Sequence, residues 1–127
     1  MEQTLIKNFY SKINGNTFIN VKDNGYDGQE KLKLLKTGDE IVPVREPNNP
    51  FDKFAIRLDN TDGFKLGYIP SKTSNGLAQD MDNGLTVIIK VSEVTGGNDS
   101  KSNVGCNIHI SVYGESEPMT TNEILND

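Results

Sequence analysis

The stretch REPNNPFDKFAIRL, residues 45–58, decides the fold, because a stiff polar loop leads directly into a core strand. Pro47 and Pro50 each fix φ and push the residue before them to an extended conformation. Asn48 and Asn49 therefore lie at set positions where their amides donate and accept hydrogen bonds. Local chemistry alone predicts a proline-stiffened turn at this point of the chain.

The end of this loop combines a charge with an aromatic ring. Asp52 offers a carboxylate just where the following strand begins. In the simplest interpretation, Phe51 packs onto the core, since turns of this composition are common. Residues 53–59 alternate apolar and polar side chains, which predicts a half-buried strand with Phe54, Ile56 and Leu58 on one face.

Working outward, the rest of the chain also consists of short alternating segments. Further strands are expected at 9–18, 40–44, 64–70, 85–95 and 104–113, a tight turn at 60–63, and two short helices within 24–39 and 71–84. About six mostly antiparallel strands with short links predict a mostly β fold, a small closed barrel or half-barrel.

Several positions carry local expectations of their own. Pro43 places its strand at an edge or a bulge, because proline cannot donate a ladder hydrogen bond. Gly15 suits a bulge in the first strand, and Asp27 suits the N-cap of the first helix. Ser71 or Ser74 is expected to cap the second helix.

Length and charge bound the function. The 127 residues suit one domain, expected at 1–113, followed by an acidic flexible tail at 114–127. A net charge of −5 argues against a nonspecific nucleic-acid binder, which is usually basic. The start has no apolar signal region and no apolar run is long enough to span a membrane, so a cytoplasmic protein is expected.

Signals for metal or catalytic chemistry are nearly absent. The chain has one histidine, His109, on the polar face of its strand, and one cysteine, Cys106, on the apolar face. Zinc needs about four ligands, so no metal site is expected, and Cys106 is interpreted as inert core. No phosphate-binding loop or dinucleotide fingerprint occurs. We therefore expect no cofactor and no enzyme activity.

Two motifs together resemble the HIRAN domain family. The first, REPNNPFDKFAI, fits the pattern R-[ED]-P-x-N-P-[YF]-D-x-x-A-I, and GFKLGYI fits the following return strand G-x-x-[LIV]-G-[YH]-[ILV]. The resemblance spans about residues 9–113 and is highly specific. It implies an OB-like β-barrel that binds single-stranded DNA at a free 3′ end, in DNA repair or replication-fork processing. It also implies a helicase or nuclease as partner.

The resemblance also implies roles for individual residues. Asp52 would accept a hydrogen bond from the 3′-hydroxyl, Asn49 would contact the end nucleotide, and Phe51 and Phe18 would stack on bases. Tyr68 would stack or bind phosphate through its hydroxyl. The DNA-binding residues expected on this ground are Phe18, Asn49, Phe51, Asp52, Tyr68 and Lys72.

Departures from the family pattern keep two alternatives open. Thr17 stands where helicase-linked members have a phosphate-binding arginine, and Ser71 stands where they have a lysine, although Lys72 is adjacent. Each lost phosphate contact weakens binding and its salt dependence. A protein-interaction or regulatory module that keeps only the fold is one alternative. An RNA-binding barrel is the other, since stacking and phosphate contacts do not exclude a 2′-hydroxyl.

Overall fold

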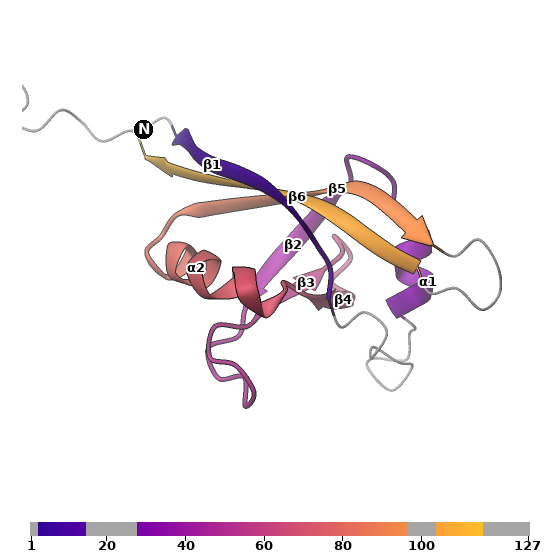
Figure 1. Ribbon diagram of the computed structural model, residues 1–127, viewed down its shortest axis with the longest axis horizontal. Helices are drawn as coiled ribbons and strands as arrows, with labels where there is room; N and C mark the ends of the chain where they lie inside the picture. The colour runs from indigo at the N-terminus through magenta and orange to yellow at the C-terminus, as the bar shows by residue number, and fades with distance from the viewer. Residues whose placement is uncertain (1–2, 15–27, 97–103, 116–127) are drawn as a thin grey trace, which may run out of the picture.

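The computed structural model describes residues 3–14, 28–96 and 104–115 (Figure 1). In these ranges the chain forms six strands and two helices. In chain order they are β1 (Gln3–Lys12), α1 (Gly28–Lys33), β2 (Glu40–Arg45), β3 (Ile56–Asp59), β4 (Lys65–Tyr68), α2 (Ser71–Asp82), β5 (Thr86–Gly96) and β6 (Val104–Glu115). The expected mostly β class with two short helices is confirmed.

All pairings in the sheet are antiparallel, in the order β1-β6-β5-β2-β3-β4. The two long strands β5 and β6 lie at its centre, and alternate residues of β6 point into the core. The five apolar residues predicted to share a face of β6 are all 3% exposed or less: Val104, Cys106, Ile108, Ile110 and Val112. This alternation, read from the sequence, is therefore confirmed.

Strand β2 passes from one half of the sheet to the other. Glu40 and Ile41 pair with β5, whereas Val42 to Arg45 pair with β3. Pro43 lies beyond the two residues of β2 that pair with β5. Its missing N–H therefore removes no hydrogen bond from the pairing with β5. The edge position predicted for Pro43 is thus wrong for the strand as a whole, since β2 has neighbours on both sides.

The sheet does not close into a barrel, and the predicted closed barrel is not confirmed. β1 and β4 remain its two edge strands. In the described ranges they are joined through one bridge, in which the N–H groups of Asn14 and Tyr68 each donate to the other's carbonyl at 2.8 Å. The sheet therefore curls until its edges meet at a single point, just after β1 ends.

Helix α2 lies beneath the long strands (Figure 1) and packs Leu77 and Met81 into the core. The predicted serine cap is wrong. Pro70 is the N-cap, and no side chain caps the helix. Ser71 is already helical, and the Ser74 hydroxyl donates to the Ser71 carbonyl at 3.4 Å. Pro70 suits this place because its φ of −54° resembles that of a helix.

Some strand limits differ from those predicted. β1 begins at Gln3, earlier than the predicted residue 9, and β6 continues to Glu115, beyond residue 113. β3 is shorter than predicted, because residues 53–55 belong to a turn in which the Ala55 N–H donates to the Asp52 carbonyl. The positions proposed for a bulge at Gly15 and a cap at Asp27 lie outside the described residues.

The turn at 60–63 is confirmed. The Asn60 side-chain oxygen accepts hydrogen bonds from the N–H groups of Asp62 and Phe64. Gly63 has a φ of 89°, which glycine adopts without strain. Neither described helix is long and apolar enough to cross a membrane.

Candidate functional site

The loop between β2 and β3 is folded back on itself by backbone hydrogen bonds. The Glu46 N–H donates to the Ala55 carbonyl at 3.0 Å and closes the base of the loop. The Asn49 N–H donates to the Glu46 carbonyl at 3.1 Å, and the Ala55 N–H donates to Asp52 at 3.0 Å. We call residues 46–55 the proline loop. It projects away from the sheet (Figure 1).

The Asn49 side chain holds the tip of the proline loop. Its Oδ1 accepts hydrogen bonds from the N–H groups of Phe51 and Asp52, at 2.9 and 3.1 Å. Its Nδ2 donates to Glu46 Oε1 at 3.0 Å. An asparagine that binds its own downstream backbone in this way fixes a turn. Asn49, the second of the two residues between the prolines, therefore shapes the loop.

The hydrogen bonds of Asn49 hold the backbone of Phe51 and Asp52 in place. Phe51 is 95% exposed, so the interpretation that it packs onto the core is wrong. Its backbone is held at the tip of the proline loop by the hydrogen bond from its N–H to Asn49. Asp52 is half-buried, and its Oδ1 accepts a hydrogen bond from the Phe54 N–H at 2.8 Å. Its carboxylate thereby acquires a fixed orientation.

Glu46 is the centre of a polar network behind the loop. Its Oε1 accepts from both Asn49 and the Tyr68 hydroxyl, the latter at 2.9 Å, and its Oε2 accepts from Arg57 Nη1 at 3.1 Å. Burial alone raises the pKa of Glu46, but these hydrogen bonds and the Arg57 charge together lower the pKa below its usual value. The carboxylate thus ties the Tyr68 side chain to the proline loop.

Two arginines, Arg45 and Arg57, connect the proline loop to neighbouring elements through ion pairs and hydrogen bonds. Arg57 forms a bidentate ion pair with Asp59, with hydrogen bonds of 2.8 and 3.0 Å. This hydrogen bonding to Asp59 is the main reason that the pKa of Arg57 is raised. Arg45 pairs in the same way with Asp82 at the end of α2, at 3.0 and 3.1 Å. Its third donor binds the Ala55 carbonyl at 3.0 Å. The loop is therefore anchored to both β3 and α2.

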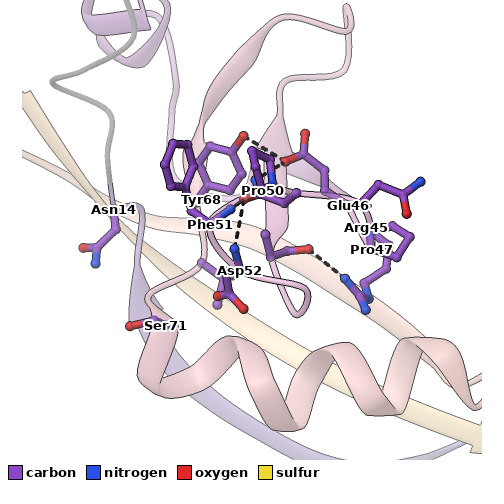
Figure 2. Close-up of a pocket in the computed structure, with 13 residues that line it drawn as sticks. Asn14, Arg45, Glu46, Pro47, Pro50, Phe51, Asp52, Tyr68 and Ser71 are labelled. Atoms are coloured by element: carbon purple, nitrogen blue, oxygen red, sulfur yellow. Dashed lines mark hydrogen bonds between the residues drawn. The ribbon is translucent and has the colours of Figure 1, made fainter.

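A groove of about 950 Å³ opens between the proline loop, β4 and the start of α2 (Figure 2). We call it the end groove, because it lies where the two edges of the sheet meet. Its lining residues are Asn14, Arg45, Glu46, Pro47, Asn48, Asn49, Pro50, Phe51, Asp52, Ala55, Tyr68, Ile69 and Ser71.

The structure brings most of the predicted site residues together. Asn49, Phe51, Asp52 and Tyr68 all line the end groove. Lys72 does not, because it lies one residue past Ser71 on the first turn of α2 and lines a separate hollow. The sixth predicted residue, Phe18, lies outside the described residues.

Two lining residues that contact Tyr68, Asn14 and Glu46, were not among the predicted site residues. Asn14 enters because the chain leaving β1 forms its bridge with Tyr68, a long-range contact without a local sequence signal. Glu46 belongs to the quoted motif but was given no role. Arg57 and Tyr68 are paired across β3 and β4, and both side chains bind Glu46. An arginine opposite a tyrosine on neighbouring strands indicates that a shared acceptor lies nearby, and this signal could have pointed to Glu46.

Cations in the end groove are already paired. Among its described lining residues, Arg45 is the only positive side chain, and Asp82 neutralises it. Glu46 and Asp52 give the groove a negative balance. The chemistry on offer is therefore an exposed ring, a fixed carboxylate and amide groups, which suit a base or a hydroxyl better than a phosphate.

The other chemically versatile residues of the described chain lie elsewhere. His109 Nε2 lies 3.1 Å from Asn8 Oδ1, and its ring lies 4.8 Å from that of Tyr10. Cys106 is buried, and burial raises the pKa of its thiol to about 11, so it stays protonated and unreactive at neutral pH. Within the described ranges, no three His, Cys, Asp or Glu side chains gather in a way that could hold a metal ion.

Comparison with solved structures places the fold among known domains. The crystal structure of the HIRAN domain of human HLTF superposes with a TM-score of 0.68 and 21% identity, over 90% of this chain and 81% of that one. An NMR structure of the HLTF HIRAN domain in its DNA-bound conformation gives 0.62 and 22%, over 91% and 81%. A protein from Lactobacillus plantarum gives 0.62 and 19%, over 86% and 96%.

Sequence comparison points the same way. The chain is similar to helicase-like transcription factors, with 48% identity to the rabbit protein (Oryctolagus cuniculus) and 34% to the human one, over 55 residues. That segment is 43% of this chain and only 6% of each relative. The HIRAN domain family model matches residues 6–117. The chain therefore belongs to the HIRAN domain family.

Proposed function

We propose that this HIRAN domain binds single-stranded DNA and receives a free 3′ end in the end groove. The observation that carries the proposal is Phe51, an aromatic ring 95% exposed at the tip of a loop that hydrogen bonds hold rigid. An exposed ring on a rigid support offers a base a stacking surface at little entropic cost. Stacking of this kind is worth about 1–3 kcal/mol per base and tolerates any sequence.

Asp52 is the residue proposed to read the terminal group. Because its Oδ1 is held by the Phe54 N–H, its Oδ2 has a defined direction and can accept a hydrogen bond from a hydroxyl. A terminal phosphate in the same place would meet two negative charges, Asp52 and Glu46, in one groove. The negative balance of the groove thus favours a free hydroxyl over a phosphorylated end.

DNA binding is supported by family membership, because an HLTF HIRAN domain has been solved in its DNA-bound conformation. We further propose a binding module without catalysis of its own. A role in repair or fork processing, alongside a helicase or nuclease, rests on the family alone.

A second candidate is a peptide-binding module. It is favoured by the end groove itself, where the single described cation is paired with Asp82 and an exposed phenylalanine stands beside two carboxylates. An apolar or basic peptide segment would suit such a surface. The two candidates differ in whether affinity depends on the chemistry of a nucleic-acid end.

The test is a fluorescence titration of oligonucleotides with a free or a phosphorylated 3′ end. We expect wild type to prefer the free end. Asp52→Asn keeps an acceptor for the Phe54 N–H but removes the charge, so it should weaken free-end binding about tenfold, the worth of about 1.4 kcal/mol from a charge-assisted hydrogen bond. Phe51→Ala should weaken both ends alike, because stacking ignores the terminal group.

Asp62→Asn is the matched control, since Asp62 is exposed in the 60–63 turn and does not line the groove. It should bind like wild type. Equal affinity of wild type and Asp52→Asn for the free end would remove the end-reading role. Failure of wild type to bind any oligonucleotide would favour the peptide-binding candidate.

A further inference from the structure

A second hollow, of about 510 Å³, adjoins the end groove. Its described lining residues are Tyr10, Ser11, Lys12, Pro70, Lys72, Thr73, Ser92 and Asn107. Ile69 and Ser71 line the end groove, whereas Pro70, Lys72 and Thr73 line the hollow. The five residues 69–73 therefore form a shared wall, and the two depressions lie on either side of it.

The charge of the hollow is opposite to that of the end groove. Its described lining includes two lysines and no acid, in a chain with a net charge of −5. Lys12 comes from the end of β1 and Lys72 from the first turn of α2, and both side chains are exposed. Serine, threonine and asparagine side chains supply further hydrogen-bonding groups around them. Such a surface fits a phosphate backbone.

An aromatic ring stands at the rim of the hollow. Tyr10 is 73% exposed, and its ring rests against His109 with 4.8 Å between centroids and 47° between planes. That contact restrains the ring from one side. An exposed aromatic beside lysines is the combination that proteins use to bind single strands.

We propose that the hollow binds the phosphodiester backbone of the nucleotides that precede the 3′ end, with Tyr10 stacking on one of their bases. This inference rests on the proposed function. It also answers a difficulty in it, because the end groove has no unpaired cation among its described residues while a single strand brings one negative charge per nucleotide. The two depressions then have different roles. The end groove binds the 3′ terminus, and the lysines of the hollow neutralise the phosphate charges of the preceding nucleotides.

The test uses two oligonucleotides with free 3′ ends, one of 3 and one of 12 thymidines, titrated by fluorescence anisotropy at several salt concentrations. Wild type should bind the longer one more tightly and with the steeper salt dependence. In the double variant Lys12→Gln/Lys72→Gln, the log–log salt slope for the longer one should fall by about 1.4, since each single-strand phosphate contact contributes about 0.7. Binding of the shorter one should stay as in wild type.

Lys33→Gln controls for lost charge, because Lys33 is exposed on α1 and lines neither depression. Tyr10→Ala should weaken the longer oligonucleotide about tenfold without changing its salt slope, because stacking releases no counterions. These surface residues leave the core untouched, so all variants should melt like wild type.

The outcomes separate the two proposals. If the lysine variant matches Lys33→Gln in both slope and affinity while Phe51→Ala still weakens binding, the hollow has no role and the end groove acts alone. If wild type binds neither oligonucleotide, the proposed function fails and this inference falls with it. If the lysine variant no longer binds the longer oligonucleotide more tightly than the shorter one, and its affinity for the shorter one is unchanged, the hollow is established as the binding site for the strand backbone.

Discussion

The proline loop and the β5–β6 pair keep their shapes by different means. β5 and β6 bury apolar residues on one face, among them Ile89, Ile108 and Ile110, each with no exposed surface. The proline loop buries little, and it is held by hydrogen bonds that converge on Asn49 and Glu46. One region is ordered by exclusion of water and the other by direction-specific polar contacts.

This difference separates stability from site geometry. A buried apolar side chain contributes about 1.5–3 kcal/mol, whereas an internal hydrogen bond contributes a net of about 1 kcal/mol. The β5–β6 pair should therefore determine whether the chain folds, and the proline loop should determine whether the folded chain binds. Three substitution experiments test that separation, in decreasing order of expected effect.

Ile108→Ala should have the largest effect on stability. Ile108 is fully buried at the centre of β6, so its truncation leaves a cavity and should cost about 2–5 kcal/mol, as measured by urea unfolding. Oligonucleotide affinity of the folded fraction should not change. Glu93→Ala, an exposed position on β5, should stay within about 0.5 kcal/mol of wild type. A weaker ligand affinity in Ile108→Ala would show that the two regions are coupled.

Asn49→Ala should do the reverse. It removes the acceptor for two backbone N–H groups and should cost about 1–2 kcal/mol, in the range of a lost helix cap. Affinity for a free 3′ end should fall further than for any stability-matched core variant, because Phe51 and Asp52 lose their fixed positions. Thr61→Ala is the control, since Thr61 is exposed in the 60–63 turn and does not line the end groove. Equal affinity in the two variants would contradict a clamping role.

Acid should affect the loop first, with the smallest change in global stability. The folded-state pKa of Glu46 lies below its unfolded value, so its stabilising contribution is complete above the unfolded pKa and is lost as pH falls through the folded one. Tyr68 and the loop should therefore loosen below about pH 4.5, the ordinary glutamate value. The NMR signals of the Tyr68 ring and urea midpoints against pH measure this, and Glu46→Gln should flatten that part of the profile. A profile that Glu46→Gln leaves unchanged would assign the acid response to other carboxyls.

The sequence predicted the parts of the fold that depend on local pattern. Alternation found the buried face of β6, and Asn60 with Gly63 indicated the turn before β4. Whether the sheet closes into a barrel could not be predicted. In the described residues, the outcome depends on the curl of six strands and on the bridge between Asn14 and Tyr68. Strand content and short links fit an open sheet as well as a barrel.

For the candidate site, the motif identified most of the residues but not the role of each one. Asn49, Phe51, Asp52 and Tyr68 do meet in one groove, because a short loop and its return strand are close in sequence. Composition did not reveal that Asn49 uses its amide within the loop, nor that Lys72 faces another hollow. Both depend on side-chain direction, and one residue along the first turn of α2 changes the depression that a side chain lines.

The bridge between Asn14 and Tyr68 gives the end groove a built-in reporter. Its two hydrogen bonds, each 2.8 Å long, join the edge strands, and both residues line the groove. Edge pairings of this kind open locally more often than central ladders, so their amide protons exchange with solvent through small fluctuations. A ligand seated across the groove would hold the two edges together and slow exchange at both amides at once. Hydrogen exchange at two backbone positions would then read occupancy of the groove without any label on the ligand.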